Sequence, residues 1–168
     1  MKIQQEDKND FEDWKRRFVF AQKQENLCAI EIPLLLGDID CETLSYLVNF
    51  LKPYGENIIR FTTKQNLLLK NIHEKYLPNF YYLYKEKFKN IPYFANHLTV
   101  CAGADTCKLG LCLSRNLARV ILDKLETFSS RFKDKKIPSI KISGCPNSCG
   151  QHWIGDIGFY GFAGRKDE

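Results

Sequence analysis

The sequence of 168 residues contains no long hydrophobic run. Its longest apolar stretches are short, such as residues 32–36, which include Pro33, whereas a helix that spans a bilayer needs about 20 apolar residues. The first 14 residues are polar and acidic, so they do not resemble a secretory signal. We therefore expect a cytoplasmic protein with no membrane partner.

The sequence also shows no internal repeat, no low-complexity segment and no nucleic-acid recognition motif. The formal net charge is +5, and Lys and Arg are spread along the chain with one concentration at residues 131–136. Such a distribution indicates a solvated surface, and a mildly basic face for an anionic cofactor or an acidic protein partner is the alternative. A nucleic-acid partner is not expected, because no motif accompanies the charge.

Cysteine, by contrast, is abundant. The chain has seven cysteines, an odd number, and without an export signal a disulfide framework is not expected. Metal ligation or redox chemistry is therefore the leading explanation for them.

Hydrophobic periodicity in the first half of the chain predicts a small α+β sandwich. Residues 1–25 are expected to form an extended arm. A helix capped by Asp40 is expected to end before Pro53 and to present Leu44, Leu47, Val48 and Leu51 on one face. Further elements are a strand at 27–32, paired strands at 57–63 and 67–70, and a helix at about 79–89.

The second half is expected to be α/β, after a boundary near residues 90–96. A helix over residues 114–128 is predicted to bury its large apolar side chains, namely Leu117, Val120, Ile121, Leu125 and Phe128. A charged turn at 133–136 and a strand at 139–143 follow. The last strand, over 154–162, contains three glycines and has no obvious partner. This ending suggests a domain that is truncated at its C-terminus.

Four of the cysteines form two pairs. Cys101 and Cys107 are separated by five residues, and Cys145 and Cys149 by three. Four thiolates from two loops are the usual requirement of a [4Fe–4S] cluster. The flanking residues Gly144, Pro146 and Asn147 permit a tight turn whose backbone amides can point at cluster sulfurs.

A zinc site is the main competing metal centre, but its paired cysteines are usually two to four residues apart, so the first gap is wide. Thiols without any metal are the remaining alternative. Cys28 lies in a predicted strand and Cys41 at a predicted helix start, where a small buried hydrophobic residue suffices. Cys112 is assigned to the core or to the surroundings of the site.

The segment Cys101-Ala-Gly-Ala-Asp-Thr-Cys107, followed by Ser143-Gly-Cys-Pro-Asn-Ser-Cys-Gly-Gln-His152, resembles the paired signature of the sirohaem-dependent nitrite and sulfite reductases. A segment like Asp156-Ile-Gly-Phe-Tyr-Gly161 comes next in that family. In the first half, Ile59-Arg-Phe-Thr-Thr-Lys-Gln-Asn-Leu67 resembles part of the family's ferredoxin-like half-domain, and residues 22–24 and 37–39 are similar too. The resemblance covers residues 14–162 and implies a half-domain at 26–90 and part of a cluster and sirohaem domain at 91–168.

The resemblance implies two cofactors, a [4Fe–4S] cluster and sirohaem. All four paired cysteines would ligate the cluster, with Cys149 bridging it to the sirohaem iron and Asn147 a weaker candidate for cofactor binding. The implied reaction reduces sulfite to sulfide or nitrite to ammonia, and the sequence leaves the substrate open. The electron donor would be ferredoxin or a flavoprotein.

Family members carry two copies of this unit, with the cysteines only in the second, so the chain is expected to correspond to the second copy. The first repeat, which supplies most of the basic residues that grip the substrate, would be a partner. Arg60 is a weak catalytic candidate, and an arginine that faces solvent or sirohaem carboxylates is the simpler interpretation. A fragment, a split subunit and a truncated reading frame all remain open. The competing function is an iron–sulfur electron-transfer module without sirohaem.

Overall fold

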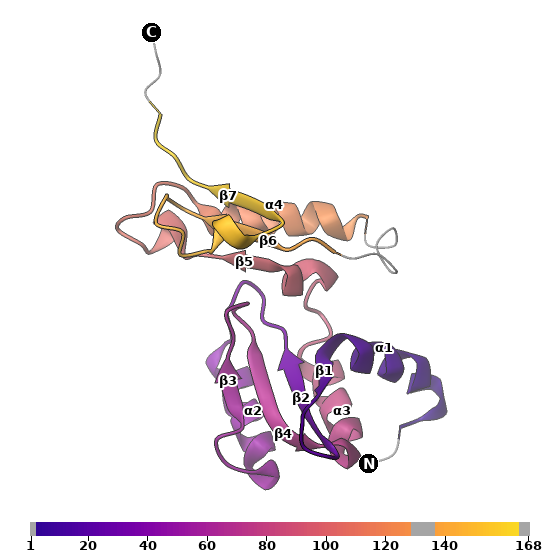
Figure 1. Ribbon diagram of the computed structural model, residues 1–168. Helices are drawn as coiled ribbons and strands as arrows, with labels where there is room; N and C mark the ends of the chain where they lie inside the picture. Colours follow the sequence, from indigo (N-terminus) through magenta and orange to yellow (C-terminus); the bar gives the residue numbers. More distant parts are fainter. Residues whose placement is uncertain (1–2, 129–136, 165–168) are drawn as a thin grey trace. The chain divides into compact units, whose positions relative to one another are not determined.

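The computed structural model describes residues 3–128 and 137–164, and its helices and strands form two units (Figure 1). The first unit comprises the chain up to residue 34 together with residues 38–91. The second comprises residues 35–37 and the chain from residue 92 onward. The predicted combination of a mixed α+β half with an α/β half is confirmed.

An antiparallel sheet of four strands forms the centre of the first unit, in the order β1-β2-β4-β3. Its strands are β1 (Val19–Ala21), β2 (Leu27–Ile32), β3 (Ile59–Phe61) and β4 (Leu67–His73). The turn from β3 to β4 is tight, because the Thr62 amide donates to the Asn66 carbonyl at 2.9 Å. Gln65 takes the positive φ of 64° that this turn requires.

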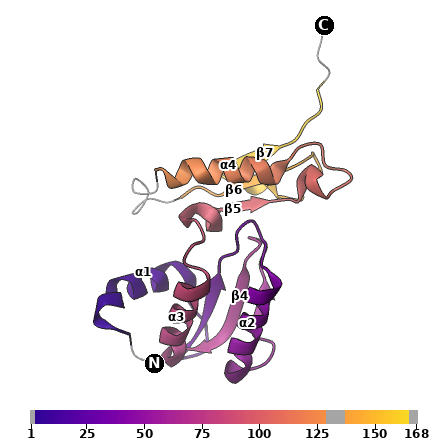
Figure 2. The ribbon, with the colours of Figure 1, turned by 180° about the vertical axis from the view of Figure 1, so that it is seen from behind.

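Two helices, α2 (Cys41–Leu51) and α3 (Leu77–Lys87), cover one face of this sheet (Figure 2). As predicted, α2 begins after Asp40, whose carboxylate accepts from the Thr43 amide at 2.8 Å. Of its predicted apolar face, Leu47 and Leu51 are buried, whereas Leu44 and Val48 are 39% and 45% exposed. The short 3-10 turns η2 (Lys52–Tyr54) and η3 (Glu74–Tyr76) follow α2 and β4.

The expectation of an extended arm over residues 1–25 is corrected. After the turn η1 (Gln5–Asp7), residues Lys8–Phe18 form helix α1, which leads directly into β1. Trp14 and Phe18 are buried, and their rings lie 5.7 and 5.3 Å from those of Tyr81 and Tyr84 on α3. Phe11, Trp14 and Phe18 recur at helical spacing, so the helix presents one aromatic face to α3.

A buried carboxylate on β2 has its partners within the first unit. Glu31 on β2 is 4% exposed, and its carboxylate accepts from the Asn66 side-chain amide at 3.0 Å. The same Asn66 side chain accepts from the Leu34 amide at 2.9 Å. Lys64 lies 3.7 Å from the Glu31 carboxylate and contributes an ion pair. The buried carboxylate is therefore hydrogen-bonded and paired, as burial of a charge requires.

A parallel sheet in the order β5-β6-β7 organises the second unit. Its strands are β5 (Leu98–Val100), β6 (Ile140–Ser143) and β7 (Ile157–Tyr160). The last strand thus has a partner, β6, which the sequence did not reveal, and β5 was not predicted at all. The described residues of this unit also form three 3-10 turns, η4 (Tyr93–His97), η5 (Gly103–Asp105) and η7 (His152–Ile154).

Helix α4 (Ser114–Glu126) packs against β5 and β6, and it buries a face that differs from the predicted one. Ser114, Ala118 and Leu122 are buried, whereas Leu117 and Val120 are 41% and 57% exposed. The small residues at four-residue spacing allow the helix to approach the sheet closely. Phe128 is also exposed, and Ile121 and Leu125 are half-buried. The predicted charged turn at 133–136 lies outside the described residues.

Across residues 3–128 and 137–164, no helix is long and apolar enough to cross a membrane.

Candidate metal centre

The paired cysteines of the second unit follow two neighbouring parallel strands. Cys101 comes directly after β5, and Cys145 comes two residues after the end of β6. Because parallel strands have their carboxyl ends at the same edge of the sheet, the two loops start side by side. The Cys101 amide donates to the Ile142 carbonyl at 3.0 Å, which extends the β5–β6 ladder by one step.

Backbone hydrogen bonds at Gly144 join the two cysteine loops. The Gly144 amide donates to the Cys101 sulfur at 2.9 Å. The Gly144 carbonyl accepts from the amides of Leu111 and Cys112, both at 2.9 Å. One residue of the second loop is therefore bonded to both ends of the first.

The two loops approach so closely at Gly144 that this position requires glycine. A Cβ atom on Gly144 would lie 2.8 Å from the Cα of Gly103 and 2.9 Å from the carbonyl oxygen of Cys112. Gly103 has φ +68°, and a Cβ on it would overlap the Ser114 hydroxyl. After β7, a Cβ on Gly161 would meet the Gly144 carbonyl and would lie 2.8 Å from the Cys112 sulfur. The glycines that flank the cysteines thus allow three backbone segments to meet.

The first loop turns sharply between its two cysteines. The Cys107 amide donates to the Gly103 carbonyl at 2.9 Å, and the Gly110 amide donates to the Cys107 carbonyl at 3.0 Å. A third bond, from the Ala104 amide to the Cys112 carbonyl at 3.0 Å, closes the loop. Cys107 is exposed at its tip, while Cys101 is half-buried at its base.

The ends of the second loop are held together by Ser143. Its hydroxyl oxygen accepts from the Gly150 amide at 3.1 Å and lies 2.9 Å from Nδ1 of His152. The His152 ring is buried and stacks on Tyr160 of β7, with centroids 4.9 Å apart. Its other nitrogen, Nε2, is buried without a hydrogen-bond partner among the described residues. Within the loop, Cys145 is buried and Cys149 is exposed.

The structure joins the backbones of the two loops but does not gather the four sulfurs into a completed metal site. Among residues 3–128 and 137–164, no group of three or more His, Cys, Asp or Glu side chains lies in an arrangement that could hold a metal ion. The residues nevertheless fit an iron–sulfur cluster in their chemistry. Four free thiols stand on two adjoining loops, and one sulfur already accepts a backbone amide hydrogen bond, as thiolate ligands of such clusters commonly do.

The other cysteines lie apart from these loops or on their surface. Cys28 is buried in β2, where its thiol contacts the Ile72 carbonyl at 3.2 Å. Burial raises the pKa of Cys28 to about 11. Cys41, predicted to be buried, is exposed at the start of α2. The Cys112 side chain is exposed and so does not belong to the core, although its backbone bonds to Gly144.

The remaining predicted candidates are exposed. Arg60 lies on β3 in the first unit, and its guanidinium donates to the carbonyls of Asn57 and Ile59 at 3.0 and 2.7 Å. Its side chain therefore folds back on its own strand. Asn147 lies at an exposed position in the second cysteine loop.

Sequence reasoning missed three residues that shape the loops, namely Ser114, Ser143 and His152. Ser143 and His152 lie within the motif that was recognised, but nothing in the spacing assigns them a hydrogen bond. Ser114 is 13 residues beyond Cys101, and only the packing of α4 brings them together. No sequence signal separates it from an ordinary helix-start serine.

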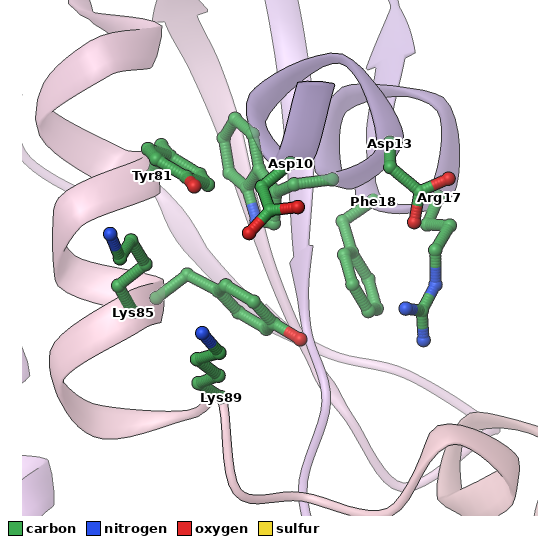
Figure 3. A pocket seen from close by; sticks show the side chains of 9 residues that line it. Asp10, Asp13, Arg17, Phe18, Tyr81, Lys85 and Lys89 are labelled. Carbon is green, nitrogen blue, oxygen red and sulfur yellow. The ribbon is translucent and has the colours of Figure 1, made fainter. Parts of the chain in front are cut away.

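A separate pocket lies in the first unit, between α1 and α3 (Figure 3). Aromatic rings and charged side chains line it: Asp10, Asp13, Trp14, Arg17, Phe18, Tyr81, Tyr84, Lys85 and Lys89. Lys85 pairs with Asp7 at 2.6 Å. Burial, with the nearby Asp7 carboxylate, raises the pKa of Tyr81 to about 12. Among the described residues, the Trp14 indole nitrogen and the Tyr81 hydroxyl are buried without a hydrogen-bond partner. The rings of the two residues pack α1 onto α3.

Comparison with known proteins shows which class of protein this chain resembles. Residues 20–85 match the nitrite/sulfite reductase ferredoxin-like half domain. The chain is 32% identical over 163 residues to the ferredoxin–nitrite reductase of Synechococcus elongatus, a match that covers 92% of this chain and 31% of that protein. It is 28% identical over 148 residues to a ferredoxin sulfite reductase of Mycobacterium tuberculosis, covering 85% of this chain and 27% of that protein.

The solved structure of the Mycobacterium tuberculosis NirA protein has a similar fold, with a TM-score of 0.70 and 26% identity. That match covers 83% of this chain and 27% of NirA. The chain therefore belongs to the family of nitrite and sulfite reductases. It spans less than a third of the length of the relatives it matches here.

Proposed function

We propose that this chain is the cluster-bearing portion of a sirohaem-dependent nitrite or sulfite reductase. Cys101, Cys107, Cys145 and Cys149 would hold a [4Fe–4S] cluster, and Cys149 would also face the sirohaem iron. The observation that carries the proposal is the junction at Gly144, where the second cysteine loop bonds to the first through its amide and its carbonyl. When bound, the two cofactors supply electrons in succession to a small oxyanion.

The chain's own residues contribute position and polarity. The Gly144 amide is aimed at the Cys101 sulfur, so a negative thiolate at that point would be stabilised. Ser143 and His152 tie down both ends of the loop that presents Cys145 and Cys149. Three glycines leave the space in which the loops approach. These features support a site in which the backbone of the two cysteine loops is positioned before any metal binds.

Anaerobic reconstitution of the full chain with iron and sulfide tests the metal assignment. We expect about four irons and four sulfides per chain, and a loss of most of them in the Cys101→Ser, Cys107→Ser and Cys145→Ser variants. Cys41→Ser is the matched control, because Cys41 is exposed and lies in the first unit. Tight zinc binding without acid-labile sulfide would contradict the cluster assignment.

The role of Cys149 is tested by adding sirohaem to the reconstituted chain. We expect Cys149→Ser to change the visible spectrum and spin state of the haem more than it lowers the iron and sulfide content of the chain. Cys101→Ser should instead destabilise the cluster itself. Equal losses in both variants would remove the case for a bridging Cys149. A cluster that forms with no sirohaem binding would favour an electron-transfer module instead.

Ferredoxin is the electron donor that the names of the relatives indicate, and nitrite or sulfite is the substrate class. Arg60 is the one catalytic candidate of this chain, and its guanidinium is bonded to nearby backbone carbonyls and not held ready for an anion. We therefore propose that turnover also requires the first repeat, which would supply the basic residues that bind the substrate. The reconstituted chain alone should reduce neither anion at a useful rate with a low-potential donor. Turnover close to that of a two-repeat enzyme would show that one copy suffices, for instance as a homodimer.

A further inference from the structure

The Ser114 hydroxyl lies against the first cysteine of the candidate site. Ser114 is the first residue of α4 and is 2% exposed. Its hydroxyl donates to the Cys101 carbonyl at 2.8 Å and lies 3.4 Å from the Cys101 sulfur. Gly103 packs on the hydroxyl so closely that a Cβ atom there would overlap it. The hydroxyl is therefore held in a buried position beside both acceptor atoms of one residue.

The protons in this arrangement depend on the state of Cys101. A free thiol has its own proton, which it can donate to the Ser114 oxygen, while the hydroxyl proton goes to the carbonyl. A thiolate that ligates iron has lost that proton and can only accept. The Ser114 hydroxyl then has two acceptors within reach, and the negatively charged sulfur is the stronger one. Gly144 already donates to the same sulfur.

We propose, on the basis of the function proposed above, that Ser114 is a positioning residue that donates a hydrogen bond to the Cys101 thiolate and thereby makes the cluster easier to reduce. The reduced cluster carries one more negative charge than the oxidised cluster. A hydrogen bond to a ligand sulfur therefore stabilises the reduced form more, and raises the reduction potential. Together with the Gly144 amide, the serine gives Cys101 two donors.

Redox titration of the reconstituted full chain tests this inference. We expect Ser114→Ala to bind a normal amount of iron and sulfide but to show a lower midpoint potential than wild type. Ser114→Thr keeps the hydroxyl and should restore a potential near that of wild type. The matched control is Thr127→Ala, since the Thr127 hydroxyl donates to a carbonyl at 2.6 Å just beyond the other end of the same helix. This control should leave the potential unchanged.

Three results would overturn the proposal, each in a distinguishable way. A wild-type midpoint potential in fully loaded Ser114→Ala would show that the hydroxyl does not act on the cluster. Loss of cluster in Ser114→Ala, with normal loading of Ser114→Thr and Thr127→Ala, would show a purely structural role. Failure of wild type to take up iron and sulfide would refute the proposed function itself.

Discussion

Replacing Gly144 by alanine tests whether the junction of the two cysteine loops is as tight as the structure indicates. The new Cβ atom would lie 2.8 Å from Gly103 Cα and 2.9 Å from the Cys112 carbonyl oxygen. Both neighbours are backbone atoms, so no side-chain rotation can relieve the contact. The first loop would have to move away from Gly144, and the three hydrogen bonds at that residue would lengthen.

Overpacking of this kind costs about 1–3 kcal/mol of the free energy of unfolding. For a unit of this size, each kcal/mol corresponds to a decrease of roughly 4–8 °C in Tm. We therefore expect a decrease of about 4–24 °C in Tm by scanning calorimetry, together with lower iron and sulfide uptake on reconstitution. Gly164→Ala is the control, because a Cβ there meets only the Phe162 ring, at 3.7 Å and 3.9 Å.

An unchanged Tm and full cluster uptake in Gly144→Ala would refute the reasoning, since they would mean that the loops can separate without loss. Equal effects in the control would point instead to a general cost of replacing glycine in this unit.

Three further predictions concern the first unit. Burial raises the pKa of Cys28 from 9.0 to about 11. As the pH rises, the thiol therefore loses its proton in the unfolded chain first, and the free energy of unfolding should fall above about pH 9. Urea titrations of Cys28→Ala should show a smaller decline of this free energy over the same pH range. Asn66→Ala removes the side chain that bonds the Leu34 amide and the buried Glu31 carboxylate. Equilibrium unfolding should show that the free energy of unfolding falls by about 1–3 kcal/mol. Asp40→Ala removes the cap of α2 and should lower the urea midpoint of unfolding in the same assay, whereas an unchanged midpoint would refute the capping role.

Several features followed from the sequence because their causes are local. Asp40 starts α2, since its carboxylate bonds an amide three residues ahead. The strand at 27–32 was correctly predicted from its composition, and the tight β3–β4 turn from its spacing. The two cysteine pairs and their glycines were visible as a motif, and the family to which they point is confirmed. Their ligand role stays a prediction.

Long-range packing decided what the sequence could not. The rings of Trp14 and Phe18 on α1 pack against α3, more than 60 residues away, and no local signal identifies that partner. Helix α4 turns its small residues to the sheet, although its larger apolar side chains favoured another face. The sequence alone supplied the cysteines and the glycines between them. Only the parallel alignment of β5 and β6 brings Gly144 to Cys101, and only the packing of α4 places the Ser114 hydroxyl beside its sulfur, because both contacts join segments whose separation in the chain carries no local signal.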